Sequence, residues 1–233
     1  MMILAIDTST SLAGLALWEA EHLWAEEAWH TRLNHSVELL PRIQRMLATQ
    51  RVAVERLAAI AVALGPGSFT GVRAGLAAAK GLALPYRIPL VGISTLDVTA
   101  YPFQQSELPV WAIISAGRGR VGAACYQRQE GSWRQVVAPQ LTTLEALCDR
   151  TDAPALFVGE IVAAEAALLR RRLGDKALVP PAALRLRRAS YLAELAAARL
   201  AVHDVDDAMS LAPIYLQTPE GHALMAEESQ VGP

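Results

Sequence analysis

The chain has 233 residues, of which 53% are hydrophobic and 19% charged, so it can bury a sizeable core in one large domain or two lobes. Its net charge of −2 argues against a protein that binds nucleic acid over its whole surface. Two cysteines without CxxC spacing, no signal peptide and no apolar run long enough to cross a membrane indicate a cytoplasmic protein.

The first half of the chain has the hydrophobic patterns of an α/β unit. Short apolar runs predict strands at residues 2–6, 12–17, 23–29, 60–64 and 88–93. An amphipathic stripe and a stretch of small residues predict helices at residues 34–49 and 70–84. Pro41 interrupts the first of these helices, because an internal proline costs about 3 kcal/mol, so the helix either starts near Leu40 or is kinked there.

The second half repeats this order of elements after a proline-containing boundary at residues 101–109. Its predicted strands are residues 110–114, 121–128, 133–137 and 155–159, and its predicted helices are residues 142–148, 161–173 and 189–202. The order strand-strand-strand-helix-strand-helix thus occurs twice, which predicts a duplicated α/β architecture. We expect a first lobe at residues 1–102 completed by the helix at 189–202, a second lobe at 108–188 and a disordered tail at 218–233.

A glycine-rich loop, GPGSFTG at residues 65–71, joins a predicted buried strand to a predicted helix. This arrangement can aim backbone N–H groups at an anion, and a carboxylate at position 7, where the first strand ends, can hold a metal–nucleotide complex. The structural alternatives are a tight turn and a carboxylate that caps its own hairpin. The loop is not a P-loop, because the Lys-Ser/Thr pair is absent. The candidate nucleotide-site residues are Asp7, Thr8, Gly65, Gly67 and Ser68.

The helix predicted after this loop is rich in small residues. Gly71, Gly75 and Ala79 recur every four residues, although a glycine within a helix costs roughly 0.5–1 kcal/mol relative to alanine. Small side chains let another backbone approach closely. The pattern therefore serves either packing on the chain's own sheet or contact with a helix of another chain.

Two further groups of residues carry no predicted site. Six arginines gather at positions 170, 171, 172, 185, 187 and 188. We interpret them as a solvated helix face, because runs of like charge usually lie on solvent-exposed surfaces. The five histidines form no HxxH or HExxH pattern, so no metal site is predicted.

Several motifs resemble those of the TsaB (YeaZ) family. They are ILAIDTST at residues 3–10, HS at 35–36 with LLP at 39–41, GPGSFTG at 65–71, AKGLA at 79–83, PLVGIS at 89–94 and PIYL at 213–216. The match is close over roughly the first hundred residues and looser beyond. The resemblance implies a duplicated ribonuclease-H-like fold of the actin and sugar-kinase type, in agreement with the repeated order of elements.

The resemblance also implies a function. TsaB is the non-catalytic partner of TsaD in making threonylcarbamoyladenosine at adenosine-37 of tRNA, together with the ATPase TsaE. By this likeness the chain is not an enzyme and needs no cofactor of its own, while ATP and a metal ion belong to partner subunits. It meets tRNA indirectly, through the complex. It pairs with TsaD through its two first-lobe helices, or with itself when alone. The implied interface residues are Leu40, Ile43, Leu47, Gly71, Gly75, Ala78 and Ala79.

The chain departs from these relatives at two places. TsaD-like chains carry HxxxH ahead of their Leu-Pro element, but here His35 is followed by Leu39, so two histidine ligands cannot be assembled. The turn SAGRGRVG at residues 115–122 lacks the acidic residues usual in the family, which leaves its role open. The alternative function is a phosphotransferase of the sugar-kinase superfamily that uses Asp7 and the loop at 65–71. Against it, the second half shows no convincing phosphate loop.

Overall fold

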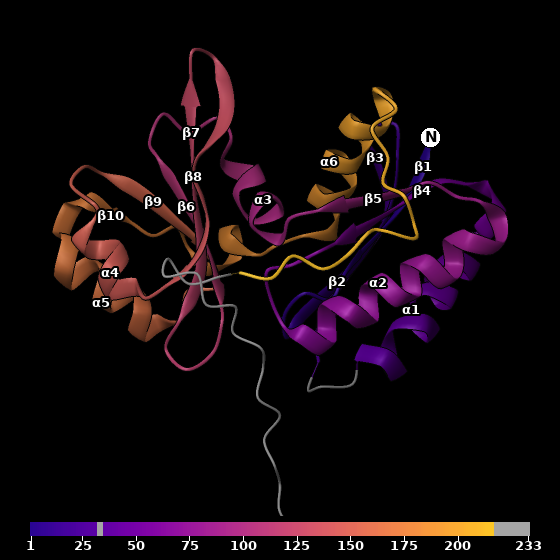
Figure 1. Ribbon diagram of the computed structural model, residues 1–233, viewed down its shortest axis with the longest axis horizontal. Helices are drawn as coiled ribbons and strands as arrows, with labels where there is room; N and C mark the ends of the chain where they lie inside the picture. The colour runs from indigo at the N-terminus through magenta and orange to yellow at the C-terminus, as the bar shows by residue number, and fades with distance from the viewer. Residues whose placement is uncertain (32–34, 217–233) are drawn as a thin grey trace, which may run out of the picture.

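The computed structural model describes residues 1–31 and 35–216, which form two lobes, each built on one five-stranded sheet (Figure 1). The first sheet contains β1 (Met2–Asp7), β2 (Leu12–Glu19), β3 (His22–His30), β4 (Leu57–Ala63) and β5 (Leu90–Ile93). The second contains β6 (Val110–Ser115), β7 (Val121–Gln129), β8 (Ser132–Thr142), β9 (Ala155–Gly159) and β10 (Ala177–Leu178). The helices are α1 (His35–Thr49), α2 (Phe69–Ala83), α3 (Thr95–Ala100), α4 (Leu144–Asp149), α5 (Ala163–Leu173) and α6 (Ala189–Ala201).

The two sheets have the same topology. Their strand orders are β3-β2-β1-β4-β5 and β8-β7-β6-β9-β10. In each sheet the first three strands are antiparallel neighbours, and the fourth and fifth strands continue in parallel from the first. The predicted duplication of an α/β unit is therefore confirmed.

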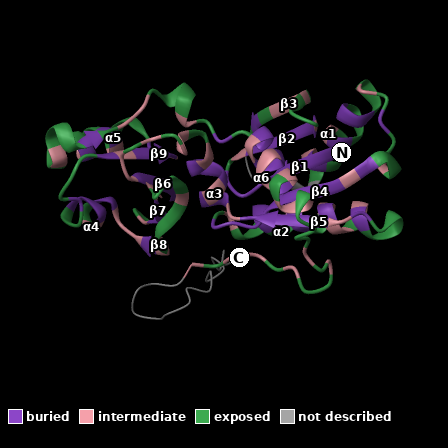
Figure 2. Ribbon diagram, turned by 90° about the horizontal axis from the view of Figure 1, so that it is seen from above, coloured by how far each residue is buried: buried purple, intermediate pink, exposed green. Residues whose placement is uncertain are grey.

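Helices cover both faces of the first sheet, which explains why every residue of β1 is buried (Figures 1 and 2). Side chains alternate between the two faces of a strand. Leu4 and Ile6 pack in the apolar cluster that includes α1 and α2, whereas Ile3 and Ala5 pack in the cluster that includes Ala193 of α6. A strand buried on both sides needs an uninterrupted apolar run, as the sequence has here.

The two lobes exchange helices. The last helix, α6, packs on the first sheet, although it follows the second sheet in the chain. Conversely, α3 follows β5 of the first sheet but packs mainly on the second, through Leu96 and Ala100, while Val98 reaches the first lobe (Figure 1). The predicted boundary at residues 101–109 falls after α3, so packing moves the division of the lobes to the start of this helix.

Most predicted elements lie within a few residues of the observed ones, and the differences have local causes. The first helix runs from His35 to Thr49 with Pro41 inside it, so the alternative start near Leu40 is wrong. Pro41 is exposed, and water can therefore reach the carbonyl that loses its N–H partner. Residue 34 and the predicted tail at 218–233 lie outside the described residues. Within the described ranges, no helix is both long and apolar enough to cross a membrane.

We predict that Ala193→Leu destabilises the first lobe, because Ala193 is fully buried where α6 meets an alanine-rich sheet face. Overpacking of this kind lowers the free energy of unfolding by about 1–3 kcal/mol, measured by urea denaturation. Ala201→Leu at the exposed end of the same helix is the control and should change it little. Equal effects of the two substitutions would contradict the close packing of α6.

Candidate functional site

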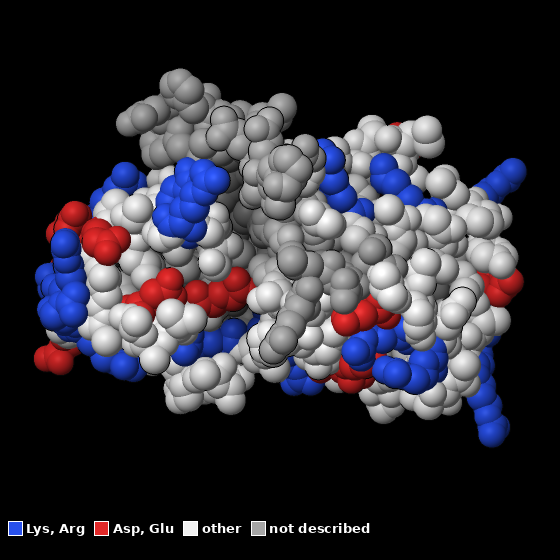
Figure 3. Space-filling model, turned by 90° about the horizontal axis from the view of Figure 1, so that it is seen from below, with Lys and Arg blue, Asp and Glu red and all other residues white. Residues whose placement is uncertain are grey.

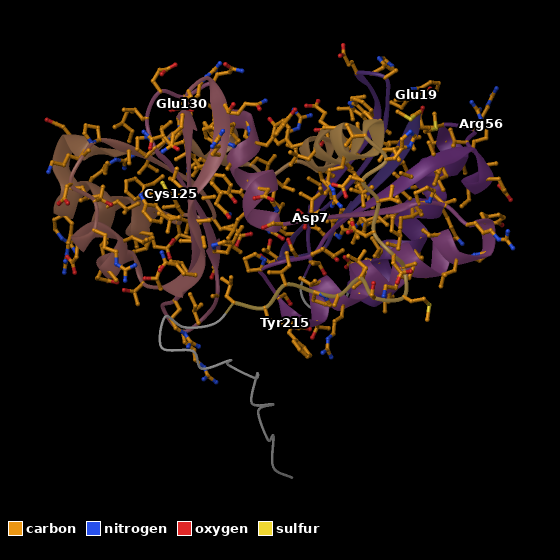
Figure 4. The ribbon with its side chains drawn as sticks, turned by 45° about the horizontal axis from the view of Figure 1, so that its top comes forward. Asp7, Glu19, Arg56, Cys125, Glu130 and Tyr215 are labelled. Atoms are coloured by element: carbon orange, nitrogen blue, oxygen red, sulfur yellow. The ribbon has the colours of Figure 1, made fainter. Side chains whose placement is uncertain are left out.

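The predicted nucleotide-site residues meet at one edge of the first sheet. Asp7 ends β1 and Thr8 follows it, while Gly65, Gly67 and Ser68 follow β4. Because β1 and β4 are parallel neighbours, both loops leave the sheet at the same edge. Figure 4 shows Asp7 near the middle of the molecule, where the two lobes meet. The structure thus brings the five predicted residues together.

The glycine loop packs directly on the turn between β1 and β2. The backbone N–H of Ser68 donates to the carbonyl oxygen of Ser9 at 2.6 Å. A Cβ atom on Gly67 would lie only 1.9 Å from that same carbonyl oxygen. Ser68 caps α2, since its hydroxyl accepts from the N–H of Gly71 at 3.2 Å. The glycine is therefore needed for close approach of the chain to itself, and the N–H of Ser68 is not available to an anion.

A buried arginine, Arg187, forms an ion pair with the carboxylate of Asp7. The Nε atom of Arg187 donates to Asp7 Oδ2 at 2.6 Å, and its Nη2 donates to the hydroxyl of Thr10 at 2.8 Å. The other carboxylate oxygen, Oδ1, accepts from the N–H and the hydroxyl of Ser9 at 2.9 and 2.6 Å. Both side chains of the ion pair are almost fully buried, at 2% and 3% exposure. Each oxygen of Asp7 thus has a donor from the protein itself.

The same arginine joins the two lobes. Its Nη1 atom donates to Glu160 Oε1 at 3.3 Å, and Glu160 directly follows β9 in the second sheet. Burial by itself would lower the pKa of Arg187, but the charges of Asp7 and Glu160 outweigh it and raise the pKa, so the guanidinium stays charged. Glu160 also accepts from the backbone N–H of Ser115 at 3.3 Å, so the end of β6 is hydrogen-bonded to the same carboxylate.

These contacts do not fit a metal–nucleotide complex, which the actin and sugar-kinase type of fold would place at this edge. The positive charge of Arg187 lies 2.6 Å from Asp7 Oδ2, where it neutralises the carboxylate and would repel a metal cation, and Ser9 donates twice to Oδ1. The topology gives Asp7 a counterpart in the second sheet, since β6 ends as β1 does, and that counterpart is Ser115. A hydroxyl there cannot supply the second negative charge.

Sequence reasoning missed Arg187 and Glu160. The interpretation of the six late arginines as a solvated face is wrong for Arg187, because this residue is buried. Arg188 beside it is exposed and pairs with Glu26 of β3. Nothing in the local sequence distinguishes the two, since the partner of Arg187 lies 180 positions away.

The predicted interface residues divide by burial. Five of them face the interior of their own lobe, where no partner can reach them: Ile43, Leu47, Gly71, Gly75 and Ala79. Leu40 is 44% exposed and Ala78 is partly buried. Burial thus argues against a partner contact at the five interior positions, and of the predicted set only Leu40 and Ala78 are accessible.

The small residues of α2 allow the helix to pack on the turn after β1. A Cβ atom on Gly75 would lie 2.3 Å from the Oγ1 atom of Thr8, which donates to the carbonyl oxygen of Gly71 at 2.7 Å. This contact settles the choice that the sequence left open for Gly75. Its missing side chain serves packing within the lobe and not a helix contact with another chain.

Comparison with known proteins agrees with this architecture. The family model described as "TsaD: tRNA N6-adenosine threonylcarbamoyltransferase" matches residues 30–222. The chain is 34% identical to the tRNA threonylcarbamoyladenosine biosynthesis protein TsaB of Bacillus subtilis, over 99% of this chain and 100% of that one. It is 29% identical to the TsaB protein of Haemophilus influenzae, over 93% and 94%. The solved structure of YeaZ from Pseudomonas aeruginosa superposes with a TM-score of 0.76 at 29% identity, covering 92% of this chain and 99% of that one.

Two ribonuclease-H-like lobes in tandem, with strand ends meeting at a central edge, define a protein of the actin and sugar-kinase-like class. Within that class the deciding features are the GPGSFTG loop packed on the IDTST turn and the likeness to TsaB over the whole chain. The chain belongs to the TsaB (YeaZ) family.

We predict that Arg187→Ala lowers the free energy of unfolding by about 3–5 kcal/mol, because it leaves the buried carboxylate of Asp7 without its counter-charge. Urea denaturation followed by circular dichroism measures the change. Arg188→Ala is the control: its ion pair with Glu26 is partly exposed, so the loss should stay below about 1 kcal/mol. If the two substitutions cost the same, Arg187 does not hold the lobes together.

We also predict that Gly75→Ala destabilises the protein by about 1–3 kcal/mol, because the new methyl group collides with the Thr8 hydroxyl. Adding Thr8→Ala should recover part of this loss, so the double variant is more stable than the sum of the single ones. Gly81→Ala is the control, since open space surrounds it, and should stabilise the helix by about 0.5–1 kcal/mol. Strict additivity of the first pair would place the cause elsewhere.

Proposed function

We propose that the chain is a non-catalytic subunit of the tRNA threonylcarbamoyladenosine machinery, which binds and supports TsaD and works with TsaE. Family membership supports the pathway. The observation that carries the non-catalytic role is the guanidinium of Arg187 on Asp7, because the residue placed to hold a metal–nucleotide complex instead forms part of the lobe junction. ATP and the metal ion then belong to the partner subunits.

The contacts of Asp7 weigh against the alternative of a phosphotransferase. That reaction needs a carboxylate on the metal and backbone N–H groups on the phosphates. Here the carboxylate is neutralised by Arg187, and the N–H of Ser68 donates to Ser9. Opening such a site would break the buried ion pair of Arg187 with Asp7, which is costly.

The outer faces of α1 and α2 are the surface that we propose for TsaD. The two helices lie side by side on the first sheet and carry exposed apolar side chains, at 71% for Val37, 44% for Leu40 and 44% for Phe69 (Figure 1). Val37 and Leu40 are three residues apart and so share one face of α1. An exposed apolar strip is what a helix-on-helix contact buries. In the absence of TsaD the same strip can pair with a second copy, so the two assemblies compete.

The charge distribution agrees with indirect contact to tRNA. In the view of Figure 3, basic and acidic side chains are interspersed over the surface instead of forming one broad basic field. The net charge of −2 is unfavourable for a protein that must hold tRNA by itself. We therefore propose that tRNA is bound mainly by the assembled complex, in the cytoplasm.

We predict that Leu40→Glu weakens binding to TsaD and self-association by tenfold or more, because it buries a charge in an apolar contact. Pull-down with TsaD and light scattering of the chain alone measure both. Leu184→Glu is the matched control, since Leu184 is 63% exposed on the second lobe, far along the chain from α1. Both variants should unfold at the wild-type urea concentration.

Reconstitution tests the function itself. With TsaD and TsaE, the wild-type chain and Leu184→Glu should support modification of tRNA, and Leu40→Glu should not at matched concentrations. Turnover of ATP by the purified chain alone would overturn the non-catalytic role. Wild-type binding of TsaD by Leu40→Glu would instead place the interface elsewhere and leave that role standing.

A further inference from the structure

A pocket of about 410 Å³ lies at the junction of the lobes, apart from the Arg187 ion pair and from the outer faces of α1 and α2. Its lining comes from α3 and α6, from β7 and β8 of the second sheet, and from the segment near residue 214. We propose that this pocket binds a small organic cation, a guanidinium or ammonium group on a short aliphatic stem. This site is independent of the function proposed above.

The charge that selects a cation is the carboxylate of Asp97 on α3. Its Oδ1 atom accepts from the hydroxyl of Tyr126 at 2.6 Å, and that hydroxyl in turn accepts from the amide of Gln135 at 3.3 Å. Across residues 1–31 and 35–216, no hydrogen bond or ion pair reaches its Oδ2 atom. Burial raises the pKa of Asp97, as expected of a carboxylate that lacks a counter-ion. Asp97 lines the pocket, where a bound cation would neutralise its carboxylate.

The other walls suit the same ligand. Trp133 stacks on Tyr126 with ring centroids 5.9 Å apart and an interplanar angle of 10°, and Tyr101 lines the pocket as well. Aromatic faces attract cations, most strongly where water is partly excluded. None of the lining residues is Lys, Arg or His, so nothing among them competes for the carboxylate or attracts an anion.

In the described part of the chain, no basic side chain forms an ion pair with Asp97. Residues 217–233 contain three glutamates, one histidine and neither lysine nor arginine. The volume falls in the range of about 300–1,000 Å³ that is usual for small-molecule pockets. The occupant is therefore an external molecule with one cationic group and no negative charge.

Butylguanidinium and its neutral isostere butylurea test the proposal on the full-length chain. The indole N–H signal of Trp133 in an NMR spectrum reports on the pocket, and Trp133→Phe identifies that signal. We expect butylguanidinium to move it in a saturable way, with Kd on the order of 1 mM, and butylurea to bind at least about tenfold more weakly. Asp97→Asn keeps the acceptor for Tyr126 but removes the charge, and should weaken butylguanidinium binding by a similar factor.

The control is Asp152→Asn, which removes the same charge from an exposed position outside the pocket and should leave binding unchanged. Three results would each overturn the proposal: no saturable shift of the Trp133 signal, equal binding of butylurea, or undiminished binding by Asp97→Asn. These outcomes are separate from those for the proposed function, because neither TsaD binding nor tRNA modification is measured.

Discussion

The ion pair of Arg187 with Asp7 and Glu160 is the contact on which the arrangement of the two lobes depends. Asp7 ends β1, the central strand of the first sheet, and Glu160 follows β9, the neighbour of the central strand in the second sheet. A guanidinium suits this position because it offers several donors in a fixed plane and stays charged when buried. Here the cation that bridges the two carboxylates is a side chain of the protein itself.

The proposed non-catalytic role depends on contacts within an actin and sugar-kinase-like fold that is otherwise complete at this edge. The strand order, the loop after β4 and the carboxylate after β1 are all present. The polar groups at this edge, however, bind each other: the N–H of Ser68 donates to the carbonyl oxygen of Ser9, and Arg187 donates to the carboxylate of Asp7. Fold alone therefore does not indicate activity in this class. The contacts of a few polar atoms do.

Much of the fold could be predicted from the sequence, because it depends on local patterns. Apolar runs and glycine-rich turns located nearly every strand and helix, and their repeated order predicted the duplication. The meeting of Asp7 with the glycine loop follows from the parallel pairing of β1 and β4. The partner of Asp7 could not be predicted, since Arg187 is distant in the chain and resembles its exposed neighbour Arg188. Nor could the role of Gly75, which depends on a single contact with Thr8.

The exchange of helices between the lobes has a consequence for synthesis on the ribosome. The second sheet takes its strands from residues 110–178, and its covering helix α3 precedes them in the chain. The first sheet is translated earlier, yet one of its faces, with Ile3 and Ala5, has no cover until α6 ends at residue 201. Long-range contacts of this kind form slowly, and apolar surface left open invites aggregation. The N-terminal lobe, although translated first, is thus completed only after α6 emerges.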